Sequence, residues 1–212
     1  TIVYALSAEA TGSLWDCGEF IAGAYKLQVV HPPGAPLFIL VGRMFTFVAE
    51  TFFPNDPSMI AYSVNLMSGI CTAFAATFAA WSTITLGKMA LVGRSDEMTT
   101  AQTIVTLGAG LVAGLGTAFT SSVWFSAVEG EVYAMSFFFT SLVFWAMLKW
   151  YSLPDTKDSD RWIVFACYMA GLSIGVHLLS LLTFPALALL YYFKKFENHN
   201  LRGGLVALAA GA

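Results

Sequence analysis

The residues best suited to chemistry stand close together near the start of the chain, in the segment WDCGEFIAGAYKLQVVHPPGAP that runs from Trp15 to Pro36. It contains two acids, Asp16 and Glu19, in a chain in which only 11% of the residues are charged. Ionisable groups are costly in an apolar protein, so such a cluster is a candidate functional site. A carboxylate in this position could act as a general base on an acceptor hydroxyl group.

Basic and imidazole groups of the same region could complete this chemistry. Lys26, His31 or Arg43 could neutralise a phosphate leaving group. On a helix over this segment, Asp16 and Glu19 share a face because they are three residues apart, and Lys26 continues that stripe about two turns further on. Two of these groups also have a structural alternative, because His31 before two prolines is typical of a turn and Arg43 could extend to lipid headgroups.

Three ionisable residues further along the chain are additional candidates for substrate binding: Glu129, Glu131 and His177. Ser126 and Glu129 have the spacing of a helix capping box, as do Ser13 and Asp16, so both acids could simply stabilise helix starts. Glu131 could be a solvated acid, and His177 could be a hydrogen-bonded core residue. Spacing alone leaves these alternatives open, including the choice between cap and base for Asp16.

The composition defines the environment in which these groups must be positioned. Hydrophobic residues make up 58% of the 212-residue chain, and the charged fraction of 11% is well below the roughly 25% of soluble domains. We therefore expect an all-α polytopic membrane protein. The net charge of −3 gives no reason to expect nucleic acid as a partner. The three cysteines have neither metal-binding nor redox spacing.

Apolar runs predict the membrane spans, because a helix needs about 20 apolar residues to cross a bilayer. We expect spans at about 60–87, 101–123, 131–151, 162–177 and 181–195, and the start of another at 203–212. Polar loops are expected at 88–100, 124–130, 152–161 and 194–202. The first residues resemble the tail of an apolar helix, so we expect the chain to be part of a larger membrane protein.

The basic residues predict the orientation. Most of them fall on alternate loops and therefore on one side: Lys88, Arg94, Lys149, Lys157, Arg161, Lys194, Lys195 and Arg202. The positive-inside rule makes that side cytoplasmic. The candidate acids and both candidate histidines then share the opposite side, periplasmic or lumenal.

The segment 36–53 is apolar but short, and it contains Arg43 and Glu50. If it crossed the membrane, the charge asymmetry of the following loops would be lost. We therefore expect it to lie in the outer interface as an amphipathic helix, with a similar surface helix over residues 16–29. Residues 7–58 would form one outer loop with two surface helices, joined at the His31-Pro32-Pro33-Gly34 turn, within a single transmembrane domain.

Three motifs carry a resemblance to known proteins: LWDCGEFIAGAYKLQVVHPPGAPLF, VEGEVYA at 128–134 and GVHLLSLL at 175–182. An acid near the start of the first outer loop, followed by a surface helix, a His-Pro-Pro turn and a second surface helix, resembles the GT-C superfamily of membrane glycosyltransferases. Together the motifs are similar to a bacterial family of protein O-mannosyltransferase-like proteins, long catalogued as a domain of unknown function. This resemblance covers nearly the whole chain.

The resemblance implies a GT-C-like helix bundle in the bacterial inner membrane, with the active-site loop periplasmic. It implies inverting transfer of a sugar, plausibly mannose, from a polyprenyl-phosphate carrier to a Ser or Thr hydroxyl of an exported protein. Asp16 would be the catalytic base, assisted by Glu19, with the phosphate near Lys26, Arg43 or His31. The outer loops lack a DxD-like pair, so a divalent metal is not indicated and no cofactor is expected.

Two other classes of function remain to be distinguished from an enzyme. A transporter would place ionisable residues near the middle of the membrane on broken helices, and the interrupted segment around His177 is the feature that fits. The absence of charged residues from the interiors of spans 60–87 and 101–123 counts against it. A non-catalytic membrane scaffold that only binds a lipid carrier is the third hypothesis.

Overall fold

The computed structural model describes residues 1–94 and 97–212, apart from the side chain of Lys157, and within these residues it is all-helical. This confirms the predicted all-α fold class. The helices are α1 (Ile2–Ser7), α2 (Cys17–Lys26), α3 (Pro36–Phe52), α4 (Pro57–Val92), α5 (Thr100–Phe119), α6 (Ser121–Val128), α7 (Val132–Ser152), α8 (Lys157–Ile174), the 3-10 helix η1 (Leu178–Thr183), α9 (Phe184–Lys195) and α10 (Leu201–Gly211).

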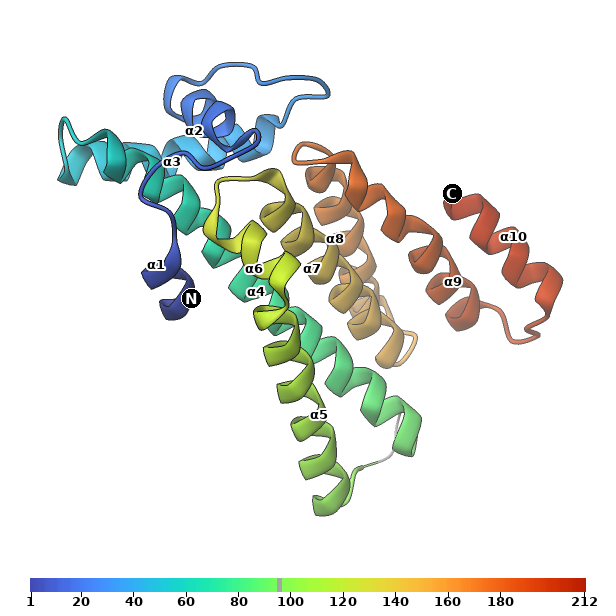
Figure 1. Cartoon of the computed structure of the whole chain (residues 1–212). Helices are drawn as coiled ribbons and strands as arrows, with labels where there is room; N and C mark the ends of the chain where they lie inside the picture. Colours follow the sequence, from blue (N-terminus) through green and yellow to red (C-terminus); the bar gives the residue numbers. More distant parts are fainter. Residues whose placement is uncertain (95–96) are drawn as a thin grey trace.

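Helix α4 is the centre of the bundle. It packs against α5 on one side and α7 on another, and α7 in turn packs against α8 and α9 (Figure 1). In the described part of the chain, four segments are long and apolar enough to cross a membrane: 57–92, 100–119, 132–152 and 178–195. With 36 residues, α4 is about 54 Å long, which exceeds the roughly 30 Å hydrocarbon thickness of a bilayer.

Several boundaries differ from those expected from the sequence. The predicted span 101–123 ends at Phe119, because Thr120 is extended and starts the separate helix α6, so most of the expected loop 124–130 is helical. The predicted span 162–177 is part of α8, which begins with a charged turn at Lys157 and ends at Ile174. The predicted span 181–195 begins inside a 3-10 helix. The expected loop 88–100 includes residues 95–96, which lie outside the described residues.

The basic residues that follow or end α4, α7 and α9 lie together at one end of the bundle, as their spacing predicted. Arg94 after α4 donates to the carbonyl of Tyr151 at the end of α7 (3.2 Å), and its guanidinium lies 4.9 Å from that ring. Lys195 at the end of α9 pairs with Asp155 in the loop after α7 (2.6 Å). These contacts join the loops farthest from α2 and α3 (Figure 1).

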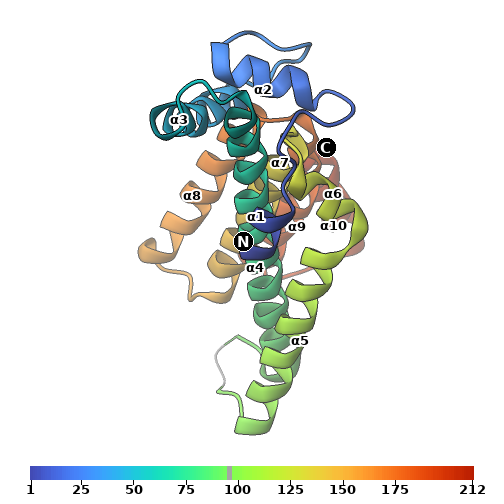
Figure 2. The ribbon, with the colours of Figure 1, turned by 60° about the vertical axis from the view of Figure 1, so that its left-hand side comes forward.

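Helices α2 and α3 lie across the opposite end of the bundle, in the two segments predicted to be surface helices (Figure 2). The first turn of α3 is tied to the bundle, since the Leu37 N–H donates to the carbonyl of Gly175 after α8 (2.7 Å). One face of α3 is buried, and its other face leaves an exposed apolar stripe of Leu40, Met44, Phe47, Val48 and Phe52. Such a stripe suits a helix that lies in a membrane interface.

A buried polar junction holds helices α2 and α3, here called the platform, to the bundle. The side chain of Asn65 on α4 is fully buried, and its amide donates to the carbonyls of Glu9 (2.8 Å) and Thr11 (3.2 Å). The thiol of Cys17, also fully buried, lies 3.7 Å from Asn65 Oδ1 and accepts the Gly130 N–H at 3.3 Å. A Cβ on Gly130 would lie 3.0 Å from Asn65 Oδ1, so glycine permits this close approach.

Replacing Asn65 by Leu should release the 8–16 segment from α4. The change removes both donors, and each lost hydrogen bond costs about 1 kcal/mol, because the carbonyls of Glu9 and Thr11 belong to exposed residues and can bind water instead. We expect a lower Tm and faster proteolytic cleavage within residues 8–16 of detergent-solubilised protein.

Asn198→Leu is the matched control, because Asn198 is exposed at the other end of the molecule. If Asn65→Leu were as stable and as protected as Asn198→Leu, the junction would not hold the platform in place.

Candidate functional site at the platform end of the bundle

Asp16 immediately precedes α2, and its side chain makes no capping hydrogen bond to the helix. The helix starts at Cys17 rather than near Ser13, and Ser13 Oγ has no hydrogen-bond partner within the described structure. The capping-box alternative for Asp16 is therefore wrong. Its side chain is 57% exposed and remains available for chemistry.

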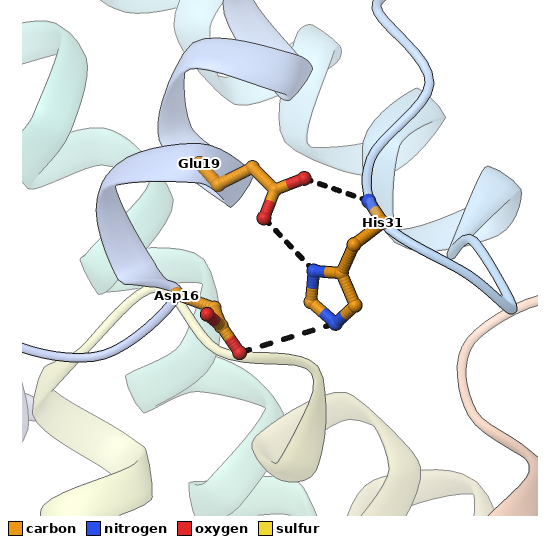
Figure 3. A group of neighbouring side chains, drawn as sticks. All are labelled: Asp16, Glu19 and His31. Atoms are coloured by element: carbon orange, nitrogen blue, oxygen red, sulfur yellow. Dashed lines mark hydrogen bonds and ion pairs between the residues drawn. The ribbon is translucent and has the colours of Figure 1, made fainter.

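Figure 3 shows that Glu19 and His31 form a pair beside Asp16. Glu19 Oε1 accepts the backbone N–H of His31 (2.7 Å), and Oε2 contacts its ring nitrogen Nδ1 (2.8 Å). The opposite ring nitrogen, Nε2, lies 3.9 Å from Asp16 Oδ2. The turn that carries His31 closes through the Gly34 N–H to the His31 carbonyl (2.9 Å), and Gly34 adopts a positive φ of 78°, which favours glycine.

The two members of this pair shift each other's ionisation. The hydrogen bond from His31 lowers the pKa of Glu19, and the same bond raises the pKa of His31 above its ordinary value. The charges of Glu19, Asp16 and Glu131 act on the His31 pKa in the same direction, while desolvation opposes them. The pair therefore favours a protonated imidazole next to Asp16.

The turn between α6 and α7 brings two further acids to Asp16. Glu129 and Glu131 are buried, with 5% and 8% of their surface exposed, and Glu129 Oε2 has no hydrogen-bond partner among the described residues. Burial, followed by the charges of Asp16 and Glu129, raises the pKa of Glu131 to about 7. Glu129 follows the last residue of α6, and Ser126 Oγ donates to the Ser122 carbonyl instead, so the capping box expected for Ser126 and Glu129 is wrong.

These groups line two adjoining clefts. The larger has a volume of about 330 Å³ and is lined by Trp15, Asp16, Phe125, Ser126, Glu129, Glu131 and Tyr133. The smaller, of about 50 Å³, contains Asp16, His31, Glu131, Tyr133 and His177 in its lining. Asp16, Glu131 and Tyr133 line both, so they stand where the two clefts meet. A cavity with aromatic walls and a few convergent polar groups is typical of small-molecule sites.

His177 lies at the start of η1, and its orientation is set by the backbone. Its Nδ1 accepts the Leu179 N–H (3.0 Å), and its ring centroid lies 5.5 Å from that of Tyr133. With Nδ1 acting as acceptor, a neutral imidazole carries its proton on Nε2. His177 is therefore a potential donor to an anion in the smaller cleft, rather than the core residue that was one alternative.

The structure does not bring Lys26 or Arg43 to these clefts; neither residue lines them. Arg43 instead lies 3.5 Å from Glu50 Oε2 and 5.4 Å from the centre of the Tyr25 ring. Lys26 is an exposed residue in the last turn of α2.

One group of side chains in the described structure could hold a metal ion. The ligand atoms of Asp16, Glu19 and His31 all lie within 4.8 Å of one another, and two carboxylates with an imidazole suit several divalent cations. An ion at this position would compete with the hydrogen bond between Glu19 and His31, which already satisfies the imidazole.

Sequence reasoning missed Tyr133 and Cys17. Tyr133 lines both clefts, and Cys17 connects Asp16 to the turn that carries the buried acids. Both lie within the motifs quoted above, where the acids drew attention because of their charge. The signal for Tyr133 was its place two residues after Glu131 at the start of a span.

The fold and the site together define a helical membrane protein with an acidic pocket at one end of its bundle. The sequence model of one family, described as the protein O-mannosyl-transferase TMEM260 N-terminal domain, matches residues 16–200, and the chain belongs to this family. No solved structure gives a significant match.

Two curated relatives are similar over most of the chain. Protein O-mannosyl-transferase tmem260 of Dictyostelium discoideum is 24% identical over 162 residues, which are 76% of this chain and 17% of that protein. Protein O-mannosyl-transferase TMEM260 of Mus musculus is 26% identical over 159 residues, 75% of this chain and 19% of that protein. The chain thus spans less than a fifth of either relative's length.

The geometry predicts that Glu19→Gln lowers the pKa of His31 toward its ordinary value, because an amide carries no charge to stabilise the imidazolium. In the parent protein the charged pair persists between the lowered pKa of Glu19 and the raised pKa of His31, and it is lost above or below that window. NMR titration of the imidazole signals in detergent measures the shift, with His31→Asn used for assignment.

Glu50→Gln provides the matched control, since Glu50 pairs with Arg43 away from the clefts. An unchanged His31 titration in Glu19→Gln, or an equal change in Glu50→Gln, would contradict the proposed coupling.

Proposed function

We propose that this chain forms the catalytic entrance of a membrane glycosyltransferase of the GT-C type, which transfers a sugar from a polyprenyl-phosphate carrier to a Ser or Thr hydroxyl of an exported protein. Membership of the TMEM260 N-terminal family supports this proposal, as do the names of the two relatives. The observation that carries it is the position of Asp16, exposed where the two clefts meet. Mannose is the proposed sugar.

Asp16 is the proposed general base. In inverting transfer, its carboxylate removes the proton of the acceptor hydroxyl while the hydroxyl oxygen bonds to the anomeric carbon. The bond from that carbon to the phosphate oxygen breaks, and its electron pair leaves with the phosphate. Glu19 holds His31 beside Asp16 (2.8 Å from Oε2 to Nδ1), so its proposed role is to orient the imidazole rather than to act on substrate itself.

The leaving phosphate must be accommodated among carboxylates, since neither Lys26 nor Arg43 lines the clefts. Three groups can donate hydrogen bonds there without a metal: protonated His31, His177 through Nε2, and Glu131 when it is protonated. A raised pKa allows Glu131 to be a neutral donor near pH 7. We therefore propose metal-independent transfer with the phosphate between these three residues.

The proposed location is the bacterial inner membrane, with the α2–α3 end of the bundle in the periplasm. The basic residues at the opposite end support this orientation, because such loops remain cytoplasmic. The exposed apolar stripe on α3 would lie at the outer headgroup level. The acceptor polypeptide would then approach Asp16 from water and the carrier from the lipid.

Asp16→Asn in the full-length protein should lower kcat for sugar transfer by about 10²–10⁴, the usual contribution of a positioned general base. The amide keeps the shape of the side chain but cannot accept the proton. Mass-spectrometric detection of the glycosylated acceptor peptide measures the loss. Asp158→Asn, at an exposed site on α8, should retain normal activity.

The same assay distinguishes the competing hypotheses. Wild-type activity in Asp16→Asn would contradict the role of Asp16 as the general base. Binding of the lipid carrier without formation of product from any donor would favour the non-catalytic scaffold. Uptake into proteoliposomes without transfer would favour a transporter. The assay contains a chelator. If the parent protein is inactive under these conditions and Mn²⁺ restores its activity, Asp16, Glu19 and His31 would instead be ligands of a cation.

The pKa of Glu131 predicts how donor affinity depends on pH. Its proton, and therefore its hydrogen bond to the phosphate, is present below pH 7 and lost as the pH rises through about 7. The KM for the donor should rise across that range in the parent enzyme. Glu131→Gln keeps a neutral donor at every pH, so its KM should rise less steeply than that of the parent, because only the His31 imidazolium is then lost with rising pH. A rise as steep as in the parent would contradict this role.

A further inference from the structure

We propose that a groove beside the acidic clefts binds the first isoprene units of the carrier lipid. This groove, here called the α7 groove, has a volume of about 520 Å³ and lies between α6, α7 and η1, with Thr72 of α4 also in its lining. The inference rests on the proposed function, because it assumes a lipid-linked donor whose sugar and phosphate occupy the clefts.

The α7 groove is continuous with the site. Ser126 and Tyr133 line both the groove and the larger cleft, and Tyr133 also lines the smaller one. From Tyr133 the groove follows α7 to Thr140, a distance of about 10 Å along the helix. A linear ligand could therefore have its polar end among the acids and its chain along α7.

The walls of the groove are chemically suited to hydrocarbon. Three of its hydroxyl groups are already satisfied by their own helices, since Thr72, Ser126 and Thr183 donate to the carbonyls of Ser68, Ser122 and Ser180 (3.0, 3.2 and 2.7 Å). These side chains can present their carbon atoms to a ligand without losing a hydrogen bond. The accessible surface of the groove is mainly apolar, whereas polar atoms make up a larger share of the surface of the clefts next to it.

The groove also lies where lipid can reach it. Helix α7 and the segment that includes η1 are both long and apolar enough to cross a membrane. On the η1 side, Leu179 and Leu182 line the groove and are 50% and 73% exposed. A lipid chain could thus enter the groove from the side, directly from the membrane.

Leu179 links the two halves of the proposed donor site. Its backbone N–H fixes the imidazole of His177, and its side chain lines the groove. The same short segment therefore orients the imidazole of His177 toward the proposed phosphate site and forms part of the groove wall for the hydrocarbon. This arrangement favours an amphiphile with a single anionic head over a free sugar phosphate.

The test uses the full-length protein in nanodiscs and a sugar-free polyprenyl phosphate that carries a photoreactive diazirine in its first isoprene unit. Crosslinks should map to α7 between Ala134 and Thr140 and to η1. Thr140→Trp fills the far end of the groove and should reduce crosslinking about tenfold, the effect of displacing about two buried methylene groups. Thr77→Trp, at an exposed site on α4 outside this groove, should leave crosslinking unchanged.

Kinetics give a second measurement that separates chain binding from folding. In Thr140→Trp the KM for a long-chain donor should rise about tenfold with kcat unchanged, while the KM for a five-carbon donor, whose single isoprene unit is too short to reach Thr140, should stay constant. Equal effects on both donors, or crosslinks outside the groove, would overturn the inference. If Thr140→Trp does not fold, Leu182→Ser should weaken long-chain binding instead, and an unchanged long-chain KM there would also overturn it.

The two proposals fail in different ways. If the protein is crosslinked within the groove but transfers no sugar, the lipid-binding site is supported and the proposed glycosyltransferase activity is refuted. If the protein transfers sugar but is crosslinked on another surface, the enzymatic activity is supported and lipid binding in the groove is refuted. Lipid binding in the groove is also refuted if another segment of the full-length protein packs there and blocks the crosslinks.

Discussion

The site depends on one buried polar contact in an otherwise apolar bundle, the amide of Asn65 on α4. Because a polar group buried in such surroundings needs partners, Asn65 binds the carbonyls of Glu9 and Thr11 and lies beside the Cys17 thiol, which accepts the Gly130 N–H. These contacts join the segment before α2, the start of α2 and the turn before α7. Asp16 and Glu131 stand next to this junction in the sequence, so it determines where they meet.

The junction brings carboxylates together that would otherwise repel one another. Three of these acids, Asp16, Glu129 and Glu131, line the clefts, and Glu19 lies beside them, paired with His31. Among the described residues, two imidazoles but no guanidinium or ammonium group line the same clefts. The structure reduces the repulsion in two ways. Glu19 is compensated by His31, and burial raises the pKa of Glu131 to about 7, so that this acid can be neutral near pH 7. An exposed ionised acid beside a neutral one is a pairing that can divide base and donor roles.

Local patterns predicted the features with local causes. The Pro-Pro turn, the short apolar segment of α3 and the alternation of basic loops gave the platform and the charged end of the bundle. Patterns could not reveal that Glu131 lies beside Asp16, 115 residues earlier, because that neighbourhood depends on the Asn65 junction. They also placed Arg43 near a phosphate, whereas its partner is Glu50, seven residues along the same helix. The second half of helix α6, residues 124–128, was expected to be part of a loop, because this short segment contains a serine and is followed by two acids.

The position of the site follows from the different solvents of its proposed substrates. A base must remain accessible to a hydroxyl group arriving from water, and the side chain of Asp16 is accordingly more than half exposed. A hydrocarbon chain must remain in lipid. The apolar α7 groove accordingly extends from Tyr133, which also lines both clefts, into the part of α7 that can cross a membrane. At the end of a membrane-spanning helix bundle, water and lipid are both within a short distance of one residue. A platform of surface helices, anchored by a buried amide, can therefore position a base there without covering the lipid entrance.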